Sequence, residues 1–180
     1  YTNNGIVRTT DYRYLVDFNK IFPDSKDKEC VWAFTKFYSA GKSSFGWDIN
    51  CFGPMVVYVN GEVAYKSDIF KERYSETSTR VFMDVEEGWN DIRIQFKKTK
   101  AGFGGQFGTW IGKWDMYTLM PTKERDGQEG FVFTELVPDD YVPEFEIGMS
   151  EKDFDKKLYP VINWSDDEMK KGQLTRMFGT

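Results

Sequence analysis

A stretch of glycine and aromatic residues, 101–114, is the part of this sequence best suited to bind a ligand. Glycine lets the backbone approach a ligand closely, and aromatic rings stack on the CH-rich faces of sugar rings. Neighbouring polar side chains can then form hydrogen bonds with the sugar hydroxyl groups. The candidate stacking residues are Trp110, Trp114, Phe103 and Phe107, and the candidate polar partners are Gln106, Lys113 and Asp115.

The same stretch has a second interpretation, in which it forms a bulged pair of strands whose aromatic side chains fill the core. Glycine is typical of bulges, and aromatic residues favour strands. The two interpretations differ in the exposure of Trp110 and Trp114, which would face solvent in a binding site and be buried in a core. A nucleotide site is not indicated, because the stretch lacks the GxGxxG spacing and no Gly-Lys-Ser/Thr follows it.

Residues 45–50 are a second candidate binding segment. In one interpretation Trp47 is an aromatic platform, and Asp48 and Asn50 form the polar rim around it. In the other, Trp47 packs in the interior while the two polar side chains cap turns. The sequence leaves both interpretations open.

The chain contains no histidine. This excludes catalytic Ser-His-Asp and Cys-His proton relays and metal sites with imidazole ligands. An enzyme would have to work through carboxylates, lysine or tyrosine. Glycoside hydrolysis needs two carboxylates that face each other across a cleft, and the sequence singles out no such pair among its 29 acidic residues. We therefore expect no catalytic residues and no turnover from this chain alone, with a small carboxylate-based glycosidase or lyase as the alternative.

Charge and cysteine content narrow the classes of partner and cofactor. A net charge of −5 gives no electrostatic basis for binding nucleic acid. No apolar run is long enough for a membrane span and no signal peptide opens the chain, so extracellular and cytoplasmic locations both stay open.

Cys30 and Cys51 are predicted to be buried free thiols. No cofactor and no metal ligand set is predicted, although the acidic turns 24–27 and 139–140 suit a structural Ca²⁺.

The elements that must position these residues are predicted to be strands. Apolar and polar residues alternate in several short segments separated by turn residues, which is typical of an all-β fold. The clearest signal is Asn60-Gly61 between two apolar runs, the sequence form of a two-residue hairpin. Residues 30–38 are apolar on both faces, which predicts a central strand. We expect an antiparallel β-sandwich of the jelly-roll type.

The character of the sequence changes after Pro138, where alternation stops and prolines punctuate an acidic stretch. Helix starts are predicted at Ser150 and at Ser165, the latter in a capping-box pattern. We therefore expect a sandwich domain over residues 1–137 and a short helical appendage over 138–180, which could be a linker to a further domain.

Two turn motifs resemble those of a known class of domain. Residues 50–62 end in Val59-Asn60-Gly61-Glu62, and Gly88-Trp89-Asn90 leads into an alternating strand. Over roughly residues 30–135 the chain resembles the N-terminal jelly-roll accessory domains of bacterial polysaccharide-degrading enzymes, including rhamnosidases, β-galactosidase-like enzymes and unsaturated uronyl hydrolases.

The resemblance implies a non-catalytic module, like a carbohydrate-binding module, that binds a polysaccharide or oligosaccharide or braces an adjacent catalytic domain. It transfers no binding residue, because the shared motifs are turns. A structural or adhesion domain with a protein partner is a further alternative, which a flat apolar patch would favour.

Overall fold

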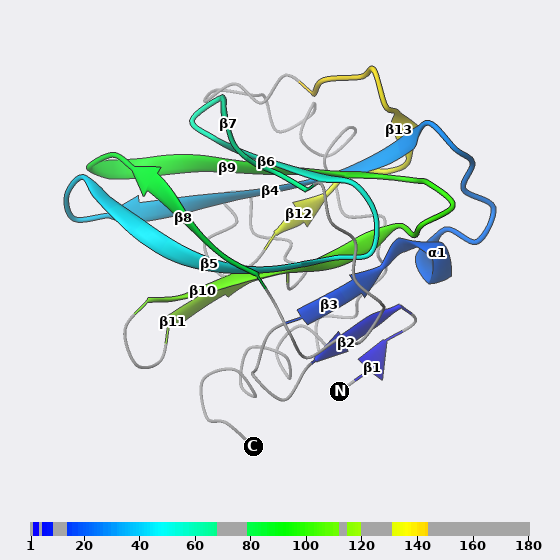
Figure 1. Ribbon diagram of the computed structural model, residues 1–180, viewed down its shortest axis with the longest axis horizontal. Coiled ribbons are helices and arrows are strands. Elements are labelled where there is room, and N and C mark those ends of the chain that lie inside the picture. Colours follow the sequence, from blue (N-terminus) through cyan, green and yellow to red (C-terminus); the bar gives the residue numbers. More distant parts are fainter. Residues whose placement is uncertain are drawn as a thin grey trace.

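The computed structural model describes residues 2–3, 5–8, 14–67, 79–111, 115–119 and 131–143. These residues form two antiparallel sheets packed face to face, with β6 and β9 of one sheet above β5 and β10 of the other (Figure 1). One short helix, α1 (Phe18–Ile21), follows the third strand, and Asp17 caps it by accepting a hydrogen bond from the Asn19 N–H. No helix in the described ranges is both long and apolar enough to cross a membrane.

The two sheets are built as follows. The first sheet has the order β1 (Thr2–Asn3), β2 (Ile6–Arg8), β3 (Tyr14–Asp17), β10 (Gly104–Ile111), β5 (Ser43–Cys51) and β8 (Thr79–Val85), with β11 (Asp115–Thr118) paired to β10. The second sheet has the order β12 (Val132–Phe133), β4 (Glu29–Ser39), β9 (Gly88–Lys97), β6 (Met55–Val59) and β7 (Glu62–Lys66), with β13 (Val137–Pro138) paired to β4.

The strand order is that of a jelly roll. Strand β3 pairs with β10, β4 with β9, β5 with β8, and β6 with β7, so the chain is folded in half as one long antiparallel hairpin. The pairs β10–β5 and β9–β6 then close this hairpin on itself and split it between two sheets. This arrangement confirms the predicted all-β sandwich and its jelly-roll type.

The main core lies between the two sheets and follows the alternation of the strands. On β5, Trp47 and Ile49 point inward, and on β9 Ile92 and Ile94 meet them from the other sheet. Because side chains alternate across a strand, the intervening residues of each strand face outward. The two cysteines are free and buried, as the sequence predicted.

Strand β4 has apolar residues on both faces, as predicted. Val31 and Ala33 belong to the main core, whereas Trp32 and Phe34 belong to a second, smaller cluster on the outer face of the second sheet. Cys30 and Val132 complete this cluster. The strand is therefore buried on both sides, which explains why its sequence does not alternate.

The predicted hairpin at Asn60-Gly61 is confirmed. Both residues have positive φ, 52° at Asn60 and 87° at Gly61, and they connect β6 directly to β7. Positive φ at both central positions is the geometry that matches the twist of the flanking strands.

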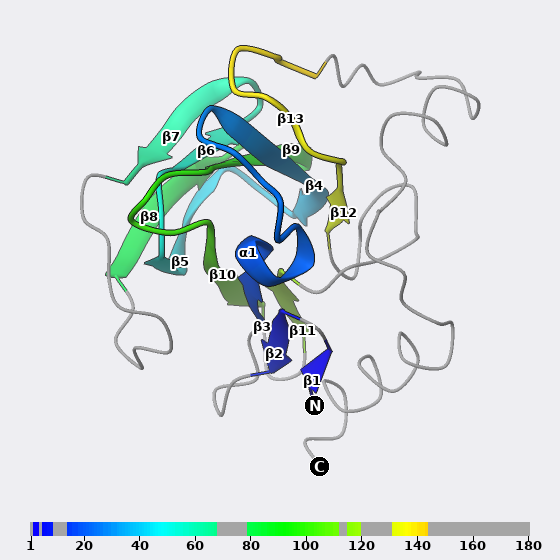
Figure 2. The same ribbon diagram turned by 90° about the vertical axis from the view of Figure 1, so that its right-hand side faces the viewer.

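The chain continues along the second sheet beyond the predicted domain boundary. Strand β13 spans that boundary, and the N–H of Asp139 donates to the carbonyl of Lys28. Figure 2 shows β12 and β13 running beside β4. The last described residue, Pro143, is buried. The predicted helices of the appendage lie outside the described residues.

Candidate functional site

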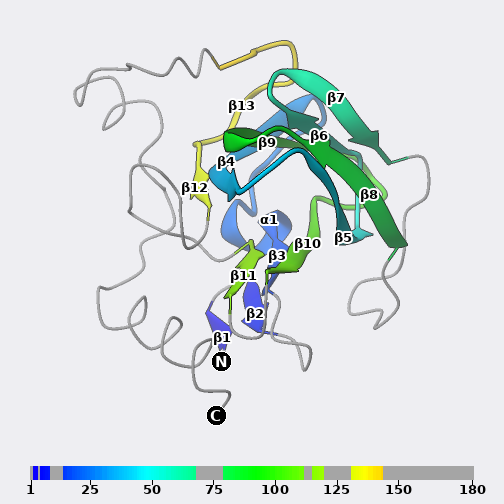
Figure 3. The ribbon, with the colours of Figure 1, turned by 90° about the vertical axis from the view of Figure 1, so that its left-hand side faces the viewer.

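The outer face of the first sheet gathers three of the residues singled out in the sequence. On β5, Asp48 and Asn50 face outward, because Trp47 and Ile49, which alternate with them, point into the core. Across β10, Gln106 is the register partner of Asn50, and Gly108 is the partner of Asp48. Figure 3 shows β10, β5 and β8 side by side in this sheet, with β8 at its edge.

Strand β8 adds two further side chains to the same face. Arg80 is the register partner of Asp48, and Phe82 is the partner of Gly46. A Cβ atom on Gly46 would lie 3.3 Å from Cδ of Arg80 and 3.5 Å from Cε1 of Phe82. Both side chains of β8 therefore lie against the bare backbone of Gly46. We call Gly46, Asp48, Arg80 and Phe82 the Phe82 site.

The aromatic ring of this site is open to solvent. Phe82 is 69% exposed, the most exposed of the large apolar residues in the described part of the chain. Its neighbours along β8, Val81 and Met83, point toward the core. An exposed aromatic ring flanked by polar groups on a sheet face has the form of a stacking platform.

Arg80 and Asp48 form a bidentate ion pair beside the ring. Nε of Arg80 donates to Oδ1 of Asp48 at 2.9 Å, and Nη2 donates to Oδ2 at 2.8 Å. The hydrogen bond that Arg80 donates to Asp48, followed by the charge of that carboxylate, raises the pKa of Arg80. The Asp48 side chain is only 12% exposed and the Arg80 side chain 60%. The carboxylate therefore holds the guanidinium in one orientation at the surface.

Asn50 and Gln106 lie on the same face of the sheet as the Phe82 site, but they are buried. Asn50 is 1% exposed and Gln106 3% exposed, so neither is at the surface. The structure thus brings these predicted polar residues together with Asp48. Asp48 contacts the exposed side chain of Arg80.

Trp47 is an interior residue, as in the second of the two interpretations of residues 45–50, and not an exposed aromatic platform. It is fully buried, and its ring stacks on Phe107 with a centroid distance of 4.8 Å and an interplanar angle of 18°. It is therefore a core residue, whereas Asp48 next to it faces outward.

Phe103 and Phe107 are also core residues. Both are fully buried; Phe103 packs on Phe18 at a centroid distance of 5.1 Å, and Phe107 meets Phe131 edge-on at 5.8 Å. Neither ring has surface on which a ligand could stack. For these two residues the structure supports the core interpretation of the glycine-aromatic stretch.

The remaining predicted residues of that stretch are described only in part. Trp110 and Asp115 are strand residues of β10 and β11, paired with Met116 and Ile111 respectively. Their side chains, and the whole of Lys113 and Trp114, lie outside the described residues. Their role in binding stays a prediction.

Close contact between backbone segments explains why two positions of the stretch, Gly102 and Gly104, are glycine. Gly104 has a φ of 136°, and a Cβ atom there would lie 2.1 Å from the carbonyl oxygen of Val16 on β3. At Gly102 a Cβ atom would lie 1.9 Å from the carbonyl oxygen of Phe52. These positions admit no side chain because two distant segments of backbone meet there.

Sequence reasoning did not select Phe82 or Arg80. The sequence does carry a signal, because the apolar residues Val81, Met83 and Val85 recur at every second position and leave Phe82 on the opposite face with Asp84. An aromatic residue on the polar face of an alternating strand departs from the pattern, and here it marks a ring that is exposed to solvent.

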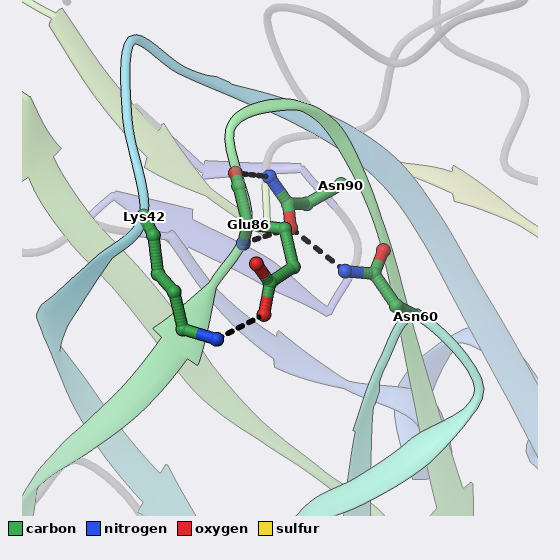
Figure 4. A network of polar contacts seen from close by, with 4 residues as sticks. All are labelled: Lys42, Asn60, Glu86 and Asn90. Atoms are coloured by element: carbon green, nitrogen blue, oxygen red, sulfur yellow. Dashed lines mark hydrogen bonds and ion pairs between the residues drawn. The ribbon is translucent and has the colours of Figure 1, made fainter.

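A separate polar network joins three turns at one end of the sandwich (Figure 4). The Asn90 side chain is fully buried, donates to the carbonyls of Glu86 and Gly88, and accepts from the N–H of Glu86. Asn60 donates to the same Asn90 oxygen, and Lys42 pairs with the Glu86 carboxylate at 2.8 Å. The network connects backbone groups of these turns, so its role is to stabilise this end of the sandwich.

The second sheet carries a partly buried ion pair on its outer face. Nε of Arg93 donates to Oδ2 of Asp91 at 2.7 Å. Burial raises the pKa of Asp91, and the charges of Arg93 and Lys36 oppose that effect.

Burial likewise raises the pKa of the Cys30 thiol. Within the described ranges no three acidic or cysteine side chains cluster as a metal site would require.

Comparison with protein-family models, with curated proteins and with solved structures found no match to this chain. The resemblance to accessory domains of polysaccharide-degrading enzymes therefore rests on the two turn motifs alone.

Proposed function

We propose that this protein is a non-catalytic accessory module of a carbohydrate-active enzyme, and that it binds glycan at the Phe82 site. The observation that carries the proposal is the exposed ring of Phe82 beside the fixed Arg80–Asp48 pair. A flat apolar surface next to oriented hydrogen-bonding groups suits a sugar ring, which has an apolar face and a rim of hydroxyl groups.

The ion pair suits this role because it is oriented before any ligand binds. Two N–H groups of Arg80 bind Asp48, and the others are left to donate to sugar oxygens at the exposed end of the side chain. A guanidinium that is already held in place loses less conformational entropy when a ligand binds.

The same pairing argues against catalysis at this site. A general acid or base must have an oxygen that is available to the substrate. Asp48 instead makes two charge-assisted hydrogen bonds with Arg80. Together with the absence of histidine from the chain, this favours a binding module over a glycosidase or lyase.

The proposal is tested by screening the pure protein against plant and microbial polysaccharides by affinity electrophoresis and titration calorimetry. We expect at least one polysaccharide to bind, and Phe82→Ala to weaken that complex about tenfold, equal to about 1.4 kcal/mol. The thermal midpoint should stay near that of the wild type, because the ring is exposed.

The matched control is Val63→Ala, which shortens another exposed apolar side chain, 57% exposed, on β7 of the other sheet. It should leave the affinity unchanged. Absence of binding to every polysaccharide, or equal affinity in Phe82→Ala and wild type, would show that glycan binding at this site is wrong.

A further inference from the structure

We infer that the Phe82 site selects neutral glycans over acidic ones. This inference rests on the proposed function and specifies the ligand class of the same site. It depends on how the charges of the described residues are distributed around the ring.

On one side of Phe82, the charge of Arg80 is already compensated. Its guanidinium contacts both carboxylate oxygens of Asp48. A glycan carboxylate would have to share that cation with a nearly buried carboxylate of the protein. The pair can donate hydrogen bonds, but it offers little net positive charge.

On the other side of the ring lies an acidic side chain. Asp84 is exposed and is the register partner of Ser44, so it faces outward as Phe82 does. It is two residues from Phe82, about 7 Å along the strand. Within the described residues Asp84 forms no ion pair.

The described cation Lys42 is paired with another carboxylate and does not neutralise Asp84. The charge of Asp84 contributes to raising the pKa of Lys42, but the larger causes are the hydrogen bond and charge of Glu86. Lys42 Nζ lies 2.8 Å from Glu86 Oε1. Among the charged residues that the structure describes around the ring, the carboxylates Asp48, Asp84 and Glu86 outnumber the cations Arg80 and Lys42, in keeping with the net charge of −5 for the whole chain.

This distribution fits a neutral sugar. Arg80 can donate to a ring or hydroxyl oxygen at one edge of a stacked pyranose, and Asp84 can accept from a hydroxyl group at the other edge. A uronate carboxylate would gain little from the compensated Arg80 and would be repelled by Asp84.

The test compares a neutral mixed-linkage β-glucan and a neutral galactan with polygalacturonate, by affinity electrophoresis at low salt and at about 0.15 M salt, where the Debye length is about 8 Å. We expect a neutral polymer to bind with little dependence on salt. Polygalacturonate should bind at least about tenfold more weakly at low salt, and the difference should narrow as salt screens the repulsion.

The variant Asp84→Asn should strengthen binding of polygalacturonate several-fold and leave the neutral polymer nearly unchanged. The control Asp140→Asn makes the same charge change at an exposed residue beyond β13 and should have no such effect. Phe82→Ala should weaken whichever complex forms.

The two proposals fail differently. If polygalacturonate binds as tightly as the neutral polymers and Phe82→Ala weakens that binding, the selectivity is wrong and the glycan site stands. If no polysaccharide of the wider screen binds, these three polymers included, or if binding does not depend on Phe82, both the site and its selectivity are wrong.

Discussion

Asn60 and Asn90 are joined by a hydrogen bond of 2.7 Å from Nδ2 of Asn60 to Oδ1 of Asn90. Asn60 lies in the β6–β7 turn, and Asn90 follows the β8–β9 turn. The Oδ1 of Asn60 in turn accepts from the N–H of Asp91. The two turn motifs on which the family resemblance rests are therefore in direct contact, and their asparagines hold one end of the sandwich together.

Replacing Asn90 with alanine should strongly destabilise the fold. The side chain is fully buried, and its loss leaves the N–H and C=O of Glu86 without these partners. The side chain makes hydrogen bonds with Glu86, Gly88 and Asn60, and since each contributes about 0.5–1.5 kcal/mol, we expect a loss of about 3 kcal/mol. Urea unfolding followed by circular dichroism measures it. The control is Lys42→Ala, which breaks only the exposed ion pair of the same network and should leave the urea midpoint unchanged. Similar midpoints for both variants would show that Asn90 does not stabilise this end of the sandwich.

Gly61→Ala should destabilise the hairpin through backbone strain alone. The φ of Gly61 is 87°, and a Cβ atom there would meet nothing within 4 Å. The expected cost is about 1 kcal/mol, the penalty of a left-handed conformation for a residue with a side chain. The control is Gly41→Ala, where a Cβ atom also meets nothing within 4 Å and φ is not positive. Equal thermal midpoints for the two variants would refute the strain.

Asp91 should make stability fall as pH rises. Burial raises its pKa above the ordinary value of 3.8, so the folded state keeps a proton that the unfolded state has already lost. The stability from this group is complete below the unfolded pKa and is lost as pH rises through the folded pKa. We expect the stability of the wild type relative to Asp91→Asn to decrease from about pH 3 upward and then level off. Urea midpoints measured across that range test this. A relative stability that increases with pH would mean that the attraction of Arg93 outweighs burial.

The sequence alone determined the local features of the fold. Alternation predicted strands such as β9, the Asn60-Gly61 pair predicted its hairpin, and the apolar faces of 30–38 predicted a central strand. Each of these depends on the chemistry of adjacent residues, because side-chain direction alternates along a strand and turn geometry is set by one or two backbone angles.

The tertiary structure decided which aromatic residues are available to a ligand. Phe107 and Phe82 both lie in strands, but Phe107 stacks on Trp47 in the core, whereas Phe82 lies over Gly46 at the surface. The Arg80–Asp48 pair likewise joins residues 32 positions apart. Such outcomes follow from the register between strands that are distant in the chain, and register depends on the packing of the whole sandwich rather than on any local pattern.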